Sequence, residues 1–429
     1  MRIRIRTEQL KTLQAPLSHL SPFFQNFSGL FRQAPFSLLF CSFTGLLAGI
    51  GLSQMTDLLR LLPGLIILIP PAIDMRGNIY SALVSRLGTS MHLGLFSPSL
   101  KKGGILYQNA YTSFLLSLFL SVILGFLAKT IADVFGMPSI SLQGFILISV
   151  IGGLISGTIL FIVAILVSII GYNRNWDLDN MSSPIITSAG DMVTIPCLFL
   201  ATLSLLKLDM LTTRWIFRDW LSLVTLVSII FIALAVICMV KGLKANDVAV
   251  RRILIESIPM LIIAGILSTL AGITLNGKLE SLIALPAFLL IIPPFLGESN
   301  GLSGILSARL SSELHIGTVN PKPIPQNLVS ANFAVIYLLS VFLFLFVGLT
   351  SYLASIYLGM ATPSVLKMLF ISLLGGILCT TFLNFASYYI AILSFRIGMD
   401  PDNDTIPLIT SLTDIVGVLC LLFAIHIMI

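Results

Sequence analysis

The chain has 429 residues, of which 57% are hydrophobic and only 10% are charged, whereas soluble domains carry about 25% charged residues. Runs of about 20 apolar residues recur along its whole length and its mean hydropathy is +1.04. A soluble globular domain is therefore excluded, and an all-α membrane protein with many spans is predicted. The net charge of +6 does not indicate a nucleic-acid partner, because Lys and Arg cluster in a few loops, as the orientation of a membrane protein requires.

Residues 1–35 are expected to form a cytoplasmic N-terminal arm. They carry Arg2, Arg4, Arg6 and Lys11 ahead of a long apolar stretch, and no short apolar core follows the basic start as it would in a signal peptide. We therefore expect a multi-pass protein of the cell (plasma) membrane whose N-terminus stays in the cytoplasm.

Two sets of five apolar spans follow the arm, and each set is predicted to form one membrane repeat. The first repeat covers residues 36–206, with spans near 36–56, 58–76, 108–134, 142–171 and 184–206. The second covers residues 253–429, with spans near 253–274, 281–297, 328–357, 365–394 and 406–429. Between them, the linker 207–252 contains one further apolar stretch, 219–240, that is long enough to cross a membrane. The prediction is a polytopic protein with about 11 spans.

The two repeats are related by one constant difference in residue number, the one that separates Asp191 from Asp414, which we call the repeat offset. Charged positions keep it as well as apolar ones. The same offset pairs Pro70-Pro71 with Pro293-Pro294, and Arg86 with Arg309. In and before the fifth span, Asp177, Asp179, Asn180, Pro184, Thr187, Ser188 and Asp191 match Asp400, Asp402, Asn403, Pro407, Thr410, Ser411 and Asp414. A register kept over this length indicates two copies of one structural unit.

An odd number of spans per repeat decides how the two copies are oriented. Two five-span copies joined directly would run in opposite directions, but the extra span at 219–240 makes them parallel. We expect a pseudo-two-fold axis along the membrane normal. With the N-terminus inside, most of the 24 Lys and Arg residues fall on the cytoplasmic side, in agreement with the positive-inside rule.

The fifth span of each repeat carries the strongest candidate site. Thr187, Ser188 and Asp191 follow Pro184 at i+3, i+4 and i+7, and therefore share one helical face. Their matches Thr410, Ser411 and Asp414 do the same.

Each aspartate should lie about 10 Å inside its helix, where a carboxylate costs about 2.5–3.5 kcal/mol unless it faces a cavity or a partner. No Lys or Arg is predicted in the middle of any span to pair with it. Asp191 and Asp414, facing each other across the axis, predict a site for a hard divalent ion, of which Mg²⁺ needs the fewest protein ligands. Structural hydrogen bonding to neighbouring helices is the alternative.

Acidic residues also precede these fifth helices. Asp177, Asp179, Asp400 and Asp402 lie at the expected helix starts. They either concentrate cations at the inner mouth of a pathway or cap the helices, because helix N-termini favour acidic side chains for their own reasons.

The second span of each repeat ends in paired prolines, which are expected to break the helix. Irregular backbone at membrane depth is tolerated where it lines a polar cavity. Asn78 and Asn300, which follow the prolines, are therefore candidate secondary ligands or contacts to an ion's hydration shell. A tight turn at the cytoplasmic surface is the alternative. Arg86 and Arg309 then lead segments that are expected to form short cytoplasmic helices.

Two motifs resemble a known family. The pattern Asp-Pro-Asp-x-x-x-x-Pro-x-x-x-Ser-x-x-Asp, from Asp400 to Asp414, and Gly-Asn-x-x-x-x-x-x-Ser-Arg-Leu, from Gly77 to Leu87, are similar to the membrane domain of MgtE-type magnesium transport proteins. The duplicated layout resembles solute carrier family 41. The resemblance implies transport of a divalent cation, with Asp191 and Asp414 at the positions of the family's pore-site aspartate. It also implies a single-chain pseudo-dimer, because the bacterial channels are homodimers with a pore on the two-fold axis.

Two other functions remain as alternatives to a plain magnesium pathway. The first is a Na⁺- or H⁺-coupled divalent cation exchanger. The second, from another class, is an intramembrane aspartyl hydrolase that uses the two aspartates. No phosphate-binding loop is present in the sequence, so transport driven directly by ATP within this chain is excluded. We expect a transporter rather than an enzyme, with the divalent cation and the lipid bilayer as partners and without a cofactor.

Overall fold

The structure, a computed structural model, describes residues 28–92, 101, 103–174, 178–212, 223–397 and 406–428. These residues form thirteen helices and no strand, which confirms the all-α class. The helices are α2 (Ser28–Gln54), α3 (Thr56–Leu61), α4 (Leu65–His92), α5 (Ile105–Val134), α6 (Leu142–Arg174), α7 (Leu178–Thr212), α8 (Leu223–Leu243), α9 (Val248–Asn276), α10 (Leu279–Ala284), α11 (Ala287–Ile316), α12 (Asn327–Tyr357), α13 (Val365–Ile397) and α14 (Ile406–Met428).

The protein crosses the membrane many times. Within the described ranges, nine helices are long and apolar enough to span: α5–α9 and α11–α14. α2 contributes the apolar stretch Leu38–Gln54. α4 has 28 residues but a lower mean hydropathy, because Asp74, Arg76 and Asn78 lie in its middle. These eleven helices are all long, whereas α3 and α10 are short helices of 6 residues each.

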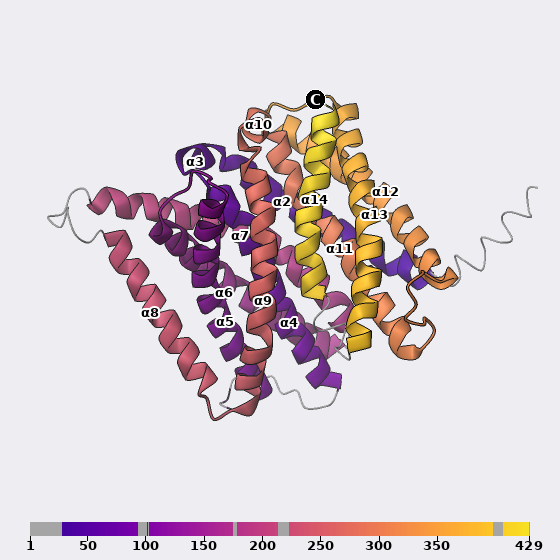
Figure 1. Ribbon diagram of the computed structural model, residues 1–429, viewed down its shortest axis with the longest axis horizontal. Coiled ribbons are helices and arrows are strands. Elements are labelled where there is room, and N and C mark those ends of the chain that lie inside the picture. The colour runs from indigo at the N-terminus through magenta and orange to yellow at the C-terminus, as the bar shows by residue number, and fades with distance from the viewer. Residues whose placement is uncertain are drawn as a thin grey trace, which may run out of the picture.

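The repeat offset is reproduced in the helices themselves. Shifted by this offset, the first and last residues of α3 become those of α10, and the first and last residues of α6 become those of α13. The short helices α3 and α10 lie at the same end of the bundle, so the two copies run in the same direction (Figure 1). α8 has the least buried span of the nine, at 22%, and lies along one side of the bundle (Figure 1).

The expectation that paired prolines break the second spans is wrong. α4 contains Pro70 and Pro71, α11 contains Pro293 and Pro294, and both helices continue well beyond them. The second span is instead interrupted earlier, between α3 and α4 and between α10 and α11. Neither irregular backbone nor a tight turn follows the prolines, and the polar residues after them therefore lie on regular helix.

Close contacts between the copies explain how the helices tolerate these prolines. A proline lacks the N–H that would bond the carbonyl four residues earlier, so Pro71 frees the Ile67 carbonyl and Pro294 frees that of Leu290. Gly272 of α9 packs directly on the Ile67 oxygen, and Gly49 of α2 packs on the Leu290 oxygen. A Cβ at either glycine would overlap the carbonyl. Cα–H···O contacts of this kind occur where helix backbones approach closely.

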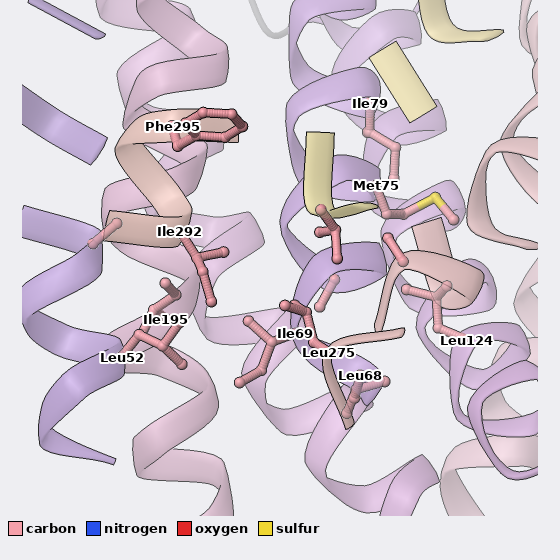
Figure 2. Packing of buried hydrophobic residues seen from close by; sticks show 14 of the residues in the cluster. Leu52, Leu68, Ile69, Met75, Ile79, Leu124, Ile195, Leu275, Ile292 and Phe295 are labelled. Carbon is pink, nitrogen blue, oxygen red and sulfur yellow. The ribbon is translucent and has the colours of Figure 1, made fainter. Parts of the chain in front are cut away.

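These contacts make an exchange between the copies, in which helices of one copy pack on helices of the other. The first long helix of each copy packs on the second long helix of the other, as α2 packs on α11 and α9 packs on α4. Leu52, Ile69, Leu275 and Ile292 are buried along this seam (Figure 2). Leu275 and Ile292 are the matches of Leu52 and Ile69 at the repeat offset. The core between the copies is therefore built from matched residues on both sides.

Arg86 and Arg309 do not lead short separate helices, as was expected. They lie within the continuous helices α4 and α11. Arg86 donates its Nε–H to Asn109 Oδ1 at 2.7 Å, and Arg309 donates to Asn332 Oδ1 at 2.9 Å. These matched bonds tie the far end of each second helix to the third helix of its own copy.

Candidate functional site

The two candidate aspartates lie on matched helices from different copies. Asp191 belongs to α7 and Asp414 to α14. Asp414 is 5% exposed, whereas Asp191 is half-buried. The two aspartates are far apart in the chain, and the residues around them come from α4, α9 and α11.

Asp414 accepts hydrogen bonds from two helices of its own copy. Asn300 of α11 lies with its Nδ2 3.1 Å from Asp414 Oδ1. Ser268 of α9 has its Oγ 3.1 Å from Asp414 Oδ2. The same Ser268 hydroxyl lies 2.7 Å from Oδ2 of Asp74 on α4. One serine therefore connects a carboxylate of the first copy with a carboxylate of the second.

This arrangement brings two carboxylates unusually close. Since Ser268 Oγ is within hydrogen-bond distance of both, Asp74 Oδ2 and Asp414 Oδ2 are less than about 6 Å apart. Asp74 also accepts from Ser411 at 2.7 Å and from Asn78 at 2.9 Å. A hydroxyl has one proton to donate and cannot satisfy two carboxylates at once. The pair therefore retains capacity to bind a positive charge.

Asp191 lies beside this pair. A Cβ at Gly297 of α11 would be 3.4 Å from Asp191 Oδ2. Asp191 is close enough to Asp74 and to Asp414 for their charges to interact. Three carboxylates, two from the first copy and one from the second, thus share one region of the bundle.

The two aspartates differ sharply in their surroundings. The polar side chains around Asp414 are Asp74, Ser268 and Asn300, as described above. The residues that match them at the repeat offset, around Asp191, are Gly297, Gly45 and Gly77. At each of these three positions, glycine therefore replaces a hydrogen-bonding or charged side chain. One half of the site is lined by ligand atoms, whereas the other half lacks these side chains, and Gly45 packs closely on Pro294.

The other predicted site residues are divided between the two halves. Asn78 and Ser411 bind Asp74, and Asn300 binds Asp414. In the first copy, Ser188 donates to Cys41 Sγ at 2.7 Å, and Thr187 Oγ1 lies 3.2 Å from Ser81 Oγ. Thr410 is half-buried on α14, one residue before Ser411.

The acidic residues expected at the mouth fall mostly outside the described part of the chain. Asp177, Asp400 and Asp402 lie outside it. Asp179 belongs to α7, but its side chain is also outside the description. Their part in attracting cations remains a prediction.

Arg76 corrects the expectation that no basic residue lies inside a span. It is fully buried in the middle of α4, two residues after Asp74. Two residues along a helix correspond to a turn of about 200°, so the side chains point to opposite faces. The guanidinium donates to Ser117 Oγ at 2.8 Å and also binds Ser121, in a notch that Gly153 leaves open. It forms no ion pair with the three carboxylates.

A further buried acid lies on the second copy. Glu298 of α11 is fully buried and accepts a bond from Ser42 of α2, while its Oε2 has no protein partner among the described residues. Glu298 thus places a carboxyl group next to Gly297, but it bonds α2 rather than Asp191.

The donor set suits a hydrated ion better than a fully dehydrated one. Within the described residues, no three His, Cys, Asp or Glu side chains are arranged to hold a metal directly. Mg²⁺ keeps several of its waters and is held by one or two carboxylates, whereas Ca²⁺ takes six to eight oxygens. The oxygen of the Asn300 amide is buried without a donor among these residues, which leaves it available to a water of such a shell.

Sequence reasoning identified Asp191, Asp414, Asn78, Asn300 and Ser411 but left out Asp74 and Ser268. Asp74 had no acidic match, since Gly297 takes its place, and the repeat logic favoured matched residues. The available signal was the charge itself, because a carboxylate within a long helix needs a partner. Ser268 carried no signal in the sequence.

The fold defines a polytopic membrane protein with carboxylates inside its helix bundle. A family model described as MgtE, divalent cation transporter, matches the chain twice, at residues 69–201 and 292–424. The two matched segments are separated by the repeat offset at both ends and together cover more than half of the chain. The chain therefore belongs to the MgtE family, and the resemblance seen in its motifs is confirmed.

Similar proteins are also found among solute carriers. Solute carrier family 41 member 2 of Xenopus laevis is 24% identical over 396 residues, which cover 87% of this chain and 67% of the relative. Member 3 of Mus musculus is 25% identical, covering 87% of this chain and 78% of the relative. Member 2 of Homo sapiens is 25% identical, covering 87% and 65%. No solved structure matches the chain. Both families are transporters and not enzymes.

Proposed function

We propose that this chain transports Mg²⁺ across the membrane, along a pathway between its two repeats, with the ion held by Asp191, Asp414 and Asp74. The description of its family as divalent cation transporters supports the class of substrate. The choice of Mg²⁺ rests on the sparse set of carboxylates, which suits an ion that keeps its water shell.

The observation that carries the proposal is the meeting of three carboxylates inside a membrane bundle. They come from α4, α7 and α14, and none of them is in an ion pair among the described residues. Each would cost about 2.5–3.5 kcal/mol in the bilayer without compensation. A divalent cation between Asp191 and the Asp74–Asp414 pair supplies that compensation.

A single chain would then form the arrangement that a homodimer forms with two chains. The interlocked helices and the matched aspartates support a pseudo-dimer with the pathway at the interface of its repeats. We propose that the protein lies in the plasma membrane with its N-terminus in the cytoplasm, and the charge distribution of the sequence supports this orientation. The proposed site serves a channel or a Na⁺- or H⁺-coupled exchanger equally well.

Flux into proteoliposomes tests the proposal. Purified protein is reconstituted into sealed vesicles that contain a Mg²⁺-sensitive dye, and entry is followed after Mg²⁺ is added outside. We expect the Asp191→Asn, Asp414→Asn double variant to lose at least about tenfold in rate, since Asn keeps the shape and removes the charge that offsets the ion's desolvation.

A matched control is the exposed Asp133→Asn, which removes a carboxylate that pairs with Lys129 at the end of α5. It should transport normally. Equal flux in the double variant and the wild type would refute the site. Repeating the assay with and without sodium and pH gradients separates a channel, which needs neither, from an exchanger.

A further inference from the structure

A band of buried polar side chains lies inside the second copy, next to the carboxylate site but outside it. Its members come from three helices and are all at most 3% exposed: Ser303 and Ser307 on α11, Thr380, Asn384 and Ser387 on α13, and Thr413 on α14. We call these six residues the polar seam.

The seam starts beside the carboxylates. Thr413 precedes Asp414, and its Oγ1 lies 3.4 Å from Ser303 Oγ. Ser303 in turn donates to the backbone carbonyl of Asn300, the residue that binds Asp414. From this point the seam leads away along α11 and α13.

The two helices run side by side in a constant register. The ring of Phe295 lies against Gly375, and Ser299 is hydrogen-bonded to Cys379, so both pairs show the same spacing between the helices. Ser307 and Ser387 have the same spacing, so we expect them to lie near each other two turns further on, with the hydroxyls of α11 toward the polar side chains of α13.

Most of the seam's polar atoms have no protein partner. Within the described part of the chain, this holds for the hydroxyls of Ser307, Thr380 and Ser387 and for both ends of the Asn384 amide. Asn384 itself is 0% exposed. Buried polar groups are nearly always hydrogen-bonded, either to protein or to ordered water. Five such atoms in one band therefore point to a ligand that fills it.

The first copy shows what the seam replaces. The residues that match Ser303, Thr380 and Asn384 are Tyr80, Gly157 and Phe161. The hydroxyl of Tyr80 packs against Gly157, where a Cβ would come within 2.8 Å of it. Two aromatic residues therefore stand where the second copy has a small serine and an amide.

We propose that the polar seam is filled with water and forms a hydrated branch from the carboxylate site into the second copy. Water is favoured over a cation because the unpaired groups include donors as well as acceptors. A cation would satisfy the oxygens and leave the Asn384 N–H groups without an acceptor. A polar, roomy site with several partners is where buried water is held. Such a file of water would let an ion bound near Asp414 exchange members of its shell.

Hydroxyl-radical footprinting tests the seam directly, because bound water itself generates the radicals. In a background without the five native cysteines, single cysteines replace Ser307 or Ser387. The matched controls are Val84→Cys and Ala164→Cys, at positions of the first copy that are 0% exposed. We expect the seam thiols to be oxidised at least tenfold faster than the controls. Equal rates at all four positions would overturn the proposal.

The variant Asn384→Leu gives a second readout that needs no cysteine. In a dry seam it removes two unpaired buried groups and raises the Tm in detergent. In a water-filled seam it removes hydrogen bonds to water, and the Tm stays the same or falls. A higher Tm would therefore also overturn the proposal. Neither measurement depends on which ion is transported, so failure here is distinct from failure of the proposed function.

Discussion

Asp74 is the residue that makes the two halves of the site unequal. It approaches Asp414 through Ser268, and in the other half its place is taken by Gly297. Bringing like charges together costs energy unless a cation offsets it, and near a protein surface two charges 4 Å apart interact with about 4 kcal/mol. We therefore expect Asp74 to contribute to cation affinity and not only to packing.

The variant Asp74→Asn should weaken Mg²⁺ binding about tenfold or more, because a charged hydrogen-bonding group is worth about 1.5–3 kcal/mol. Binding is measured by isothermal titration of the protein in detergent. The repeat offers a sharp control: the double variant Asp74→Gly, Gly297→Asp moves the carboxylate to the matched position of the other half. Recovery of binding in the swapped protein supports a site shared by both halves, whereas Asp74→Asn with unchanged affinity would show that this carboxylate is structural.

Arg76 lies in the same helix as Asp74 and carries the opposite charge. Its guanidinium is fully buried and is held by hydroxyls instead of carboxylates. A helix is about 10–12 Å wide, and unit charges about 10 Å apart interact by about 1.7 kcal/mol at an effective dielectric of about 20. Arg76 therefore repels a cation at the site across the body of α4.

We expect Arg76→Met to bind Mg²⁺ at least about tenfold more tightly in the same titration, since the repulsion is removed and the apolar chain keeps part of the packing. Arg76→Lys keeps the charge and is the control, which should bind like the wild type. An Arg76→Met protein that folds and binds Mg²⁺ with unchanged affinity would contradict this account of the electrostatics.

At the scale of helices, the structure depends on two close contacts between helix backbones, α2 with α11 and α9 with α4. Gly49 lies on the Leu290 carbonyl and Gly272 lies on the Ile67 carbonyl, so α2 and α9 cannot carry a side chain there. Both contacts cross from one copy to the other. They also cover carbonyls that proline has deprived of their helical partner.

Alanine at Gly49 or Gly272 should lower stability by about 1–3 kcal/mol, because an added methyl in a packed interface forces the helices apart. The control is Gly304→Ala in α11, where a Cβ would meet nothing within 4 Å. That change should be neutral or stabilising, since Ala favours helix by about 1 kcal/mol over Gly. Thermal unfolding in detergent gives the comparison, and equal Tm values for Gly49→Ala and Gly304→Ala would be the contrary result.

The sequence predicts where helices form far better than which helices contact one another. Apolar length gave the spans, and the repeat offset gave the duplication, because both are local or periodic properties. The continuity of α4 through Pro70 and Pro71 could not be foreseen, since it depends on Gly272 of the other copy, far along the chain. The Asp74–Ser268–Asp414 contact was hidden for the same reason: three distant segments supply it, and only Asp414 belongs to a motif.

At the scale of the whole molecule, the matched loops should lie on one side of the membrane. Val134, at the end of α5, is 77% exposed, and its match Tyr357, at the end of α12, is 90% exposed. The glycines that follow, Gly136 and Gly359, both take positive φ, at 64° and 67°. The turn after the third long helix is therefore the same in both copies.

Single cysteines test this orientation in sealed cells or vesicles. In a cysteine-free background, Val134→Cys and Tyr357→Cys should both react with a membrane-impermeant thiol reagent added outside, because parallel copies place them on the same face. Asn246→Cys, in the exposed turn between α8 and α9, is the control and should react only after the membrane is opened. Labelling of Val134→Cys and Tyr357→Cys from opposite faces would require inverted copies.

The exchange of helices between copies also has a consequence for biosynthesis. Gly49 is translated long before Leu290, the residue that covers it, because more than half of the chain lies between them. At roughly 5–20 residues per second, the ribosome needs on the order of 10–50 s to make that part of the chain. During that interval the glycine face of α2 is covered by lipid or by the insertion machinery. The partner of α9 is present from the start, because α4 is already in the membrane when Gly272 emerges. Two contacts that are equivalent in the finished protein are thus made in opposite order, and nascent chains halted before α11 should expose only the α2 half of the exchange.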